Sequence, residues 1–134
     1  MSVMGTAGVG ASSDGVNVTN AASHTFISTV DAAVSITGNS ATDDGVELLN
    51  SESTTTGLGG SITIMGTTTG TGSDSDGVDA NGSALSTMGD TATISVTGVS
   101  AGGDGVFLGS SGSTTTGAGG SISIMGTTTG TGSD

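Results

Sequence analysis

Apolar and polar residues alternate in several short segments of this chain, so that every second side chain is apolar. The clearest segments are Ser61-Ile-Thr-Ile-Met-Gly66 and Ser121-Ile-Ser-Ile-Met-Gly126. Successive side chains of a β-strand point to opposite faces, so this alternation predicts strands with one face in the interior. The pattern also predicts two rows of stacked interior side chains: Val34, Ile62, Ile94 and Ile122, and then Val3, Ile36, Ile64, Val96 and Ile124.

Two further strands are predicted in each repeat of the pattern. One follows each Asp-Gly pair and points apolar pairs inward: Val16/Val18, Val46/Leu48, Val78/Ala80 and Val106/Leu108. The other is rich in threonine and covers Ser53–Thr56 and Ser113–Thr116, with Thr25–Ser28 and Leu85–Met88 as less regular counterparts. Glycine-rich segments such as Gly57-Leu-Gly-Gly60 are typical of corners, because glycine adopts positive φ without a Cβ penalty.

These segments recur at a nearly constant interval. The tripeptide Asp-Gly-Val occurs at Asp14, Asp44, Asp76 and Asp104, with spacings of 30, 32 and 28 residues. Residues 44–74 and 104–134 agree at 25 of 31 positions. Such an interval is typical of solenoids, in which each repeat stacks on its neighbours and needs only a few apolar side chains of its own.

We therefore predict an all-β fold, a right-handed parallel β-helix (β-solenoid) of about four turns of roughly 30 residues, with three short strands in each turn. The turns are expected at 14–43, 44–75, 76–103 and 104–134, with 1–13 as the end of a preceding turn, all in one repetitive segment 1–134. Disorder is the alternative, because Gly, Ser and Thr supply more than half of the chain. The regular spacing of the aliphatic residues favours the solenoid.

The repeated units Asp-Gly-Val-x-Leu and Thr-Thr-Thr-Gly-x-Gly-Gly-Ser-Ile-x-Ile-Met-Gly resemble the β-strand-repeat regions of giant bacterial exoproteins. Those regions are similar in style to filamentous haemagglutinins and autotransporter passengers. The resemblance covers nearly all of the chain and implies a secreted or surface-displayed right-handed β-helix with adhesive, matrix or filament roles. The chain departs from that pattern because it has no haemagglutinin-type secretion segment and no recognisable capping unit.

The charge balance excludes several classes of partner. The chain has 12 acidic residues and neither Lys nor Arg, so we predict that it binds no nucleic acid. Substrate phosphates and carboxylates would find no basic clamp. The absence of cysteine excludes disulfides and thiolate chemistry. No apolar run approaches the length of a membrane span, so we predict that the chain does not span a membrane.

The sequence predicts no enzyme activity. The chemistry of pectate-lyase-like β-helices resembles proton abstraction by a basic side chain beside calcium, and this chain has no Lys or Arg to supply it. A polysaccharide hydrolase would need acids gathered in one cleft. Asp74, Asp76 and Asp79 are close in sequence but lie on a predicted turn without aromatic platforms for a sugar. His24 is the sole histidine, and no Gly-x-Ser-x-Gly motif accompanies it.

The aspartates of the repeat have two interpretations. Asp14, Asp44, Asp76, Asp104 and Asp134 are expected to form a column at one corner of successive turns. Each can accept backbone N–H groups within its own turn, which is the structural interpretation that we favour. Alternatively, a cation relieves their mutual repulsion, with Asp74, Asp76 and Asp79 as an oxygen-rich site that superficially resembles a calcium loop. Apart from calcium in this alternative, no cofactor is expected.

The functional prediction follows from the repetition. Val3-Met-Gly5 aligns with the end of a unit, so the sequence begins in mid-turn and ends at a turn boundary, with strand edges unprotected by Pro or Lys. We predict a structural protein of the bacterial cell surface that is an adhesin, a matrix component or a filament, assembling end to end or forming part of a longer chain. The alternative is an acidic module that binds calcium or a glycan; ice binding by threonine ladders is less favoured.

Overall fold

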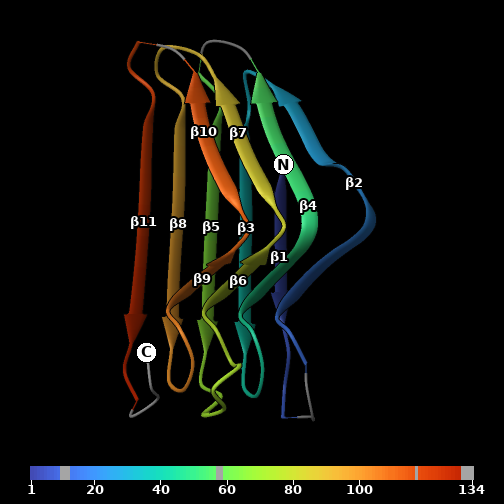
Figure 1. Cartoon of the computed structure of the whole chain (residues 1–134), viewed down its shortest axis with the longest axis vertical. Helices are drawn as coiled ribbons and strands as arrows, with labels where there is room; N and C mark the ends of the chain where they lie inside the picture. The colour runs from blue at the N-terminus through green and yellow to red at the C-terminus, as the bar shows by residue number, and fades with distance from the viewer. Residues whose placement is uncertain (10–12, 57–58, 117, 131–134) are drawn as a thin grey trace.

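The chain is built from parallel β-strands that wind around one interior (Figure 1). The computed structural model describes residues 1–9, 13–56, 59–116 and 118–130, without the side chains of residues 20–30, 55, 56 and 116. Every regular element of these residues is a strand, and every pairing between them is parallel. The predicted all-β solenoid of stacked parallel strands is therefore confirmed, and about three of its turns enclose a buried interior.

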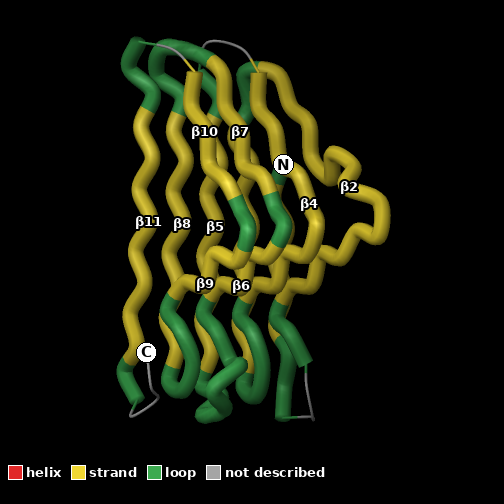
Figure 2. The backbone as a smooth tube through the Cα atoms, viewed as in Figure 1, coloured by secondary structure: helices red, strands yellow, loops and turns green. Residues whose placement is uncertain are grey.

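Sheet A stacks the alternating apolar segments of successive turns in the order β1, β3, β5, β8, β11. These strands are β1 (Ser2–Thr6), β3 (Ala33–Ser40), β5 (Ser61–Thr68), β8 (Thr93–Ser100) and β11 (Ser121–Thr128). Their register confirms both predicted interior rows, because Ile62 pairs with Val34 and Ile94, and Ile64 pairs with Ile36 and Val96. Figure 2 shows these strands running side by side, with the loops gathered at the two ends of the sheet.

Sheet B faces sheet A and contains the other strands in the order β10, β7, β4, β6, β9, with β2 also paired to β4. Its strands are β2 (Val16–Val30), β4 (Val46–Thr56), β6 (Val78–Asn81), β7 (Ala84–Met88), β9 (Val106–Gly109) and β10 (Gly112–Thr116). The two halves of β4 pair with β6 and with β7. The structure thus has three strands in the turns formed by β6–β8 and β9–β11. In β2 and in β4 the two predicted strands of sheet B are instead one long, bent strand, because β2 and β4 remain paired on both sides of the bend.

The threonine-rich pairings were predicted correctly at one place and incorrectly at another. Leu85–Met88 pairs with Ser113–Thr116 as expected. The partners of Ser53–Thr56 in the first turn are Ile27–Val30, two residues further along than the predicted Thr25–Ser28. The reason is an irregularity in β2, whose register against β4 shifts between Thr19 and His24 and again between Thr25 and Ile27. The extra residues of β2 have no equivalents in β4.

The interior is a thin column of aliphatic side chains between the two sheets. The fully buried members include Ile36, Ile62, Ile64 and Ile94 of sheet A, with Val46 and Val78 of sheet B. The predicted inward positions Val16, Val18, Leu48 and Ala80 are also buried. Burying these side chains supplies the main driving force for folding, at about 1.5–3 kcal/mol for each large aliphatic residue.

Serine hydroxyl groups connect successive turns at the bend of sheet B. Ser51 Oγ donates to the carbonyl of Val18 (2.9 Å), and Ser83 Oγ donates to that of Leu48 (2.8 Å). Ser111 Oγ donates to the carbonyl of Ala80 in the same way (2.7 Å). Each hydroxyl satisfies a backbone group that the bend would otherwise leave unpaired. The preceding residue has a left-handed backbone in every case, with φ of 51° at Asn50, 64° at Gly82 and 54° at Ser110.

The two sheets meet closely at the Asp-Gly corner. A Cβ atom on Gly66 of β5 would overlap the carbonyl oxygen of Gly77, and one on Gly77 would overlap the backbone nitrogen of Val99. Glycine is therefore required on both sides of this contact, since any side chain would push the sheets apart. This explains why the repeat carries glycine both in Met-Gly and in Asp-Gly-Val.

Candidate functional site

The Asp-Gly-Val corners lie side by side at the lower end of the molecule in Figure 1, in the loops that lead from β1, β3, β5 and β8 back to sheet B. The N–H of Gly45 donates to the carbonyl of Asp76 (2.9 Å), and the N–H of Val46 donates to that of Gly77 (3.1 Å). The same two bonds join the turns of Asp14 and Asp44, and those of Asp76 and Asp104. These four aspartates therefore occupy equivalent positions in successive turns, whereas Asp134 lies outside the described residues. We call the carboxylates of these loops and of the first residues of β4 and β6 the acidic corner; they are Asp14, Asp43, Asp44, Glu47, Asp74, Asp76, Asp79 and Asp104.

Two carboxylates of the column bind the backbone of the next turn. Asp44 Oδ1 accepts the backbone N–H of Asp76 (2.7 Å), and Asp76 Oδ1 accepts that of Asp104 (2.7 Å). Our structural interpretation placed these bonds within each turn, and the bonds of Asp44 and Asp76 correct it. A loop N–H that needs an acceptor lies directly one level along the stack, so the side chain joins two turns.

Burial raises the pKa of several of these groups. The pKa of Asp44, of which only 5% is exposed, rises to about 8, chiefly through burial, with repulsion from Asp76, Asp79 and Asp14 adding to it. The N–H of Asp76 opposes this rise. Burial likewise raises the pKa of Asp76 to about 6 and, with help from the negative charge of Asp14, that of Glu47 to about 7. Ionising these carboxyl groups of the acidic corner therefore costs free energy.

Two groups of three carboxylates converge closely among the described residues. Asp44, Glu47 and Asp79 each place one carboxylate oxygen within 4.8 Å of the other two, and so do Asp14, Asp43 and Asp44. Asn17 lies beside both groups, because its Nδ2 donates to Asp14 Oδ2 (2.7 Å) and to Glu47 Oε2. Carboxylate oxygens in such a cluster are the ligands that hard divalent cations prefer.

The predicted metal residues Asp74, Asp76 and Asp79 lie along one groove. This groove has a volume of about 290 Å³ and is also lined by Ser73, Asp104 and Phe107. Asp79 belongs to one of the convergent carboxylate groups, while Asp74 and Asp76 belong to neither group found among the described residues. The three residues thus share a surface, and metal binding by this particular trio stays a prediction.

Sequence inspection missed Asp43 and Glu47 as members of the cluster. Glu47 lies beside Asp79 because β4 and β6 are neighbours in the ladder, although the two residues are far apart in the chain. The repeat interval of 32 residues between Asp44 and Asp76 is the signal that finds this contact, since it also separates Glu47 from Asp79. In a solenoid, neighbours in space come from the next turn more often than from the same loop.

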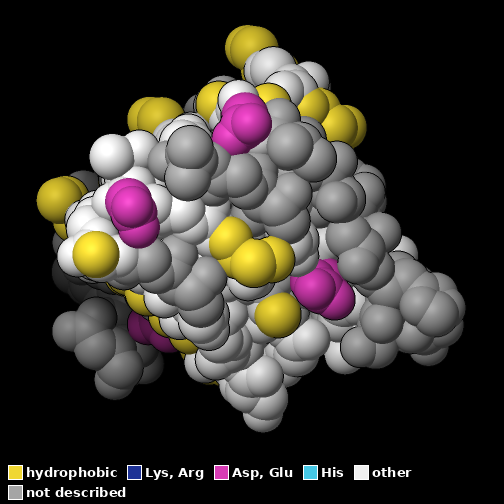
Figure 3. All heavy atoms as spheres, turned by 90° about the horizontal axis from the view of Figure 1, so that it is seen from above, with side chains coloured by type: hydrophobic (Ala, Val, Ile, Leu, Met, Phe, Trp, Pro, Cys, Tyr) yellow, Lys and Arg dark blue, Asp and Glu magenta, His cyan; other side chains and the backbone are white. Residues whose placement is uncertain are grey.

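Acidic side chains are arranged differently at the opposite end of the molecule. Figure 3 looks down on the upper end of Figure 1 and shows acidic side chains that lie apart from one another. The lower end brings carboxylates together because its loops are short and in register, whereas Asp90 lies in a separate loop between β7 and β8. The clustering is therefore a property of the Asp-Gly-Val corner and not of acidic composition alone.

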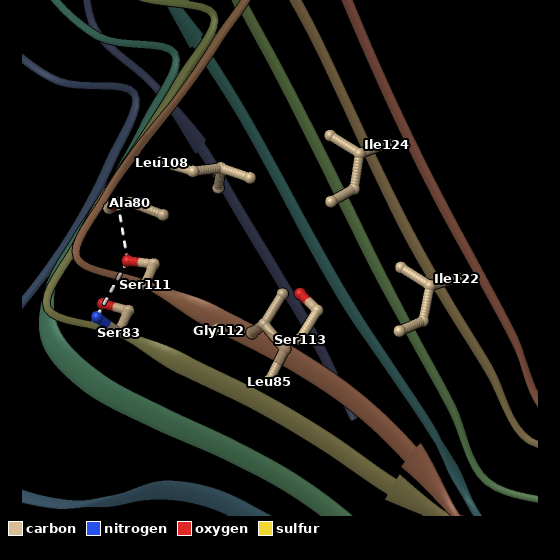
Figure 4. Close-up of a pocket in the computed structure, with 9 residues that line it drawn as sticks. All are labelled: Ala80, Ser83, Leu85, Leu108, Ser111, Gly112, Ser113, Ile122 and Ile124. Carbon is tan, nitrogen blue, oxygen red and sulfur yellow. Dashed lines mark hydrogen bonds between the residues drawn. The ribbon is translucent and has the colours of Figure 1, made fainter.

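A second surface lies where the interior opens at the last turn. Leu85, Leu108, Ile122 and Ile124 point into a cavity of about 200 Å³ between the sheets (Figure 4), and we call these four residues the open end. Ile122 and Ile124 are each 44% exposed, whereas Ile62 and Ile64 in the same rows are 0% exposed. Val106 and Leu108 face the interior, as predicted. Leu108 nevertheless remains 41% exposed, because no described strand covers β9 and β11.

Some of the predicted features involve side chains that the structure does not describe. The side chain of His24 and those of Thr55, Thr56 and Thr116 are not among the described atoms. Ice binding by the threonine triplets therefore stays a prediction. Among the described residues, no helix has the length and apolar character that a membrane span requires.

Comparison with known proteins adds no assignment. No protein-family model, no curated protein and no solved structure matches the chain.

Proposed function

We propose that this chain is a structural β-solenoid that lengthens by end-to-end stacking on a second copy of itself. The observation that carries the proposal is the open end, where Leu108, Ile122 and Ile124 expose apolar surface that is buried in the same rows of the inner turns. Contiguous exposed apolar surface of this kind is typical of an interaction site. Strands β9 and β11, which bear it, are in register with the strands of the preceding turn.

The opposite end of the molecule offers the matching surface. Strand β1 pairs with β3 on one edge and, among the described strands, with nothing on the other. Val3 stands in the row of Ile36, Ile64, Val96 and Ile124, so β1 of one copy can pair with β11 of the next in the register that β8 and β11 already use. Such a head-to-tail contact does not close on itself and therefore propagates as a fibre.

The experiment compares two charge insertions at neighbouring positions. Ile124→Asp places a charge on the open end, and Met125→Asp places the same charge on the exposed outer face of the same strand. In sedimentation velocity and electron microscopy, the wild type and Met125→Asp should form oligomers that grow with concentration, while Ile124→Asp stays monomeric. A wild type that remains a folded monomer at all concentrations and salt levels contradicts the proposal.

A mixing experiment tests the head-to-tail direction. Val3→Asp blocks the β1 end and leaves the open end intact, whereas Ile124→Asp does the reverse. Each variant alone should be monomeric, and an equimolar mixture should form dimers and nothing larger, because only one pair of intact surfaces remains. Dimers of either variant alone would contradict the head-to-tail contact and indicate a symmetric one.

Our proposal includes the finer architecture and the location of the molecule. A right-handed solenoid of four turns is supported by the strong preference of parallel crossovers for that hand and by the four intervals between the five strands of sheet A. A role as an adhesin, matrix component or filament on a bacterial surface is supported by the resemblance to exoprotein repeats. Density at side-chain resolution tests the hand, and immunogold labelling of intact source cells tests the location.

A further inference from the structure

One strand position of sheet B stays empty when two copies stack end to end. Among the described residues, sheet A has five strands, whereas sheet B has four levels, formed by β2, by β4, by β6 with β7, and by β9 with β10. Each copy therefore adds five strand spacings to sheet A and only four to sheet B. When β1 of one copy pairs with β11 of another, a gap of one strand separates β9 and β10 from β2 of the next copy.

The inner face of this empty position is the apolar open end. Among the described strands, β9 pairs with β6 alone and β10 with β7 alone, so each has a second edge without a neighbour. Leu108 of β9 and Ile122 and Ile124 of β11 face the cavity of about 200 Å³ (Figure 4). A strand added to β9 places every second side chain over this cavity, as β6 places Val78 and Ala80 in the interior one turn earlier.

The outer face of the same position is acidic. Phe107 follows the inward-facing Val106, is 39% exposed, and lines a groove of about 290 Å³ together with Asp79 and Asp104. A residue that pairs with Phe107 on an added strand therefore meets an aromatic ring and two carboxylates. Lys or Arg suits both, because a cation is attracted to the face of a ring and to negative charge. The chain has neither Lys nor Arg, so a second copy cannot supply this residue.

The bend of sheet B adds a third requirement. The N–H of Ser51 donates to Ser83 Oγ (3.2 Å), and the N–H of Ser83 donates to Ser111 Oγ (3.0 Å). A serine at the equivalent position of an added strand can accept the N–H of Ser111. Its own hydroxyl can donate to the carbonyl of Leu108, as that of Ser83 does to the carbonyl of Leu48. A serine therefore continues the series of hydrogen bonds into the next turn.

We propose that the free edge of β9 and β10 binds an extended, basic segment of a partner protein as an added parallel strand. The segment places an apolar, a basic and an apolar residue opposite Val106, Phe107 and Leu108, and a serine opposite Ser111. Backbone hydrogen bonds to the edge supply affinity, and the alternating side chains supply specificity. The inference rests on the proposed stacking for its setting, since the segment fills the position of sheet B that two stacked copies leave empty.

The first experiment uses a peptide derived from the chain's own sheet B. Residues 78–88 form β6, the bend and β7, and Asp79→Lys in this peptide gives it the proposed pattern. Fluorescence anisotropy of the labelled, end-capped peptide measures its affinity for Val3→Asp, a protein variant that keeps the open end and is expected to stay monomeric. We expect saturable binding that weakens as KCl is added. The absence of saturable binding would overturn the proposal.

Two control peptides separate the shape of the strand from its charge. The unchanged peptide keeps Asp79 and should bind about tenfold more weakly or worse. Equal binding would overturn the basic partner and favour a strand from a second copy. A peptide with both Asp79→Asn and Ala80→Lys has the same net charge as the first, but its lysine faces the apolar cavity, so it should also bind about tenfold more weakly. Equal binding of this peptide would overturn the register by showing that charge alone acts.

Variants of the protein locate the bound peptide. In the Val3→Asp background, Leu108→Asp alters the inner face and Phe107→Ala the outer face, and each should weaken binding about tenfold or more. Asp90→Asn removes a charge from the loop between β7 and β8 and should leave the affinity unchanged. Phe107→Ala decides the outcome if Leu108→Asp does not fold. Undiminished binding to Phe107→Ala would overturn the assignment to this edge.

The partner strand and end-to-end stacking can fail separately. Binding of the Asp79→Lys peptide to Val3→Asp supports the site even if the wild type never assembles. A wild type that assembles, together with a peptide that does not bind, overturns the partner strand and leaves the stacking intact. Where both occur, the peptide should lower the protein concentration at which oligomers form. Dissociation of the oligomers by the peptide would overturn its placement between two copies.

Discussion

Strands β5 and β11 carry nearly the same sequence in two different surroundings. Their first six residues, Ser-Ile-Thr-Ile-Met-Gly and Ser-Ile-Ser-Ile-Met-Gly, differ at one position. β5 lies between β3 and β8, while β11 pairs with β8 alone among the described strands. The two isoleucines are fully buried in β5 and nearly half exposed in β11. Local alternation therefore determines which face is apolar, and the presence of a next turn determines whether that face is buried.

The largest expected effect comes from shortening the isoleucine of the same interior row in β5 and in β11. Ile64→Ala removes a fully buried side chain and should lower the free energy of unfolding by about 3–4 kcal/mol. Ile124→Ala removes a half-exposed one and should cost about 1 kcal/mol in the monomer. Urea unfolding followed by circular dichroism measures both. Equal losses would contradict the difference in burial between the two strands.

The equivalent glycines of these two strands, Gly66 and Gly126, also differ in the space around them. A Cβ on Gly66 would overlap the carbonyl oxygen of Gly77, whereas the nearest atom to one on Gly126 is Val106 N at 2.9 Å. Gly66→Ala should therefore cost about 2–3 kcal/mol and Gly126→Ala about 1 kcal/mol, because the last turn can move outward to relieve the contact. Chemical denaturation of the two variants measures the difference. A loss at Gly126 as large as that at Gly66 would show that the last turn is as constrained as the inner ones.

The acidic corner makes the inner turns sensitive to pH. An unfolded aspartate titrates near 3.8, while burial raises the pKa of Asp44 to about 8 and that of Asp76 to about 6. Between these values the folded state binds more protons than the unfolded state, so stability should increase as pH falls from about 8 to about 5. In EDTA, we expect Tm to rise on the order of 5 °C over this range. Asp44→Asn should flatten the profile at its alkaline end; an unchanged profile would place the titration elsewhere.

The smallest expected effect concerns the bend of sheet B. Gly82 and Ser110 occupy equivalent left-handed positions, with φ of 64° and 54°. Ser110→Gly should stabilise by about 0.5 kcal/mol because glycine has no Cβ penalty there, while Gly82→Ala should destabilise by about 1–2 kcal/mol. Thermal unfolding of the two variants at pH 7 measures the opposite signs. A loss of stability in Ser110→Gly would mean that the serine hydroxyl contributes more than the backbone strain.

Much of the fold could be predicted because the sequence repeats. The rows through Ile62 and Ile64 follow from alternation and the repeat interval, and both are confirmed. The merging of two strands into β4 could not be predicted, since it depends on pairing with β2 through the bend at Asn50. The irregular register of β2 was missed for a related reason: residues 20–26 have no counterpart of equal length in the other turns.

The candidate site was predicted less well than the fold. The column of aspartates could be found from the repeat, and Asp79 was among the chosen residues. Asp74 and Asp76 were grouped with it because they are close in sequence, whereas the ladder places Glu47 beside Asp79. The direction of the Asp44 hydrogen bond also depends on the exact height of one turn above another, which alternation does not encode.

The direction of the ladder has a mechanical consequence. Hydrogen bonds between parallel turns, such as Val46 N–H to the Gly77 carbonyl, point along the axis of the stack. A pull along that axis therefore loads the terminal strand bond by bond and peels it away, so the resisting force stays low and nearly constant. Each freed turn replaces a rise of about 4.8 Å with roughly 100 Å of extended chain. A rod of such turns would therefore lengthen about twentyfold under steady tension along its axis.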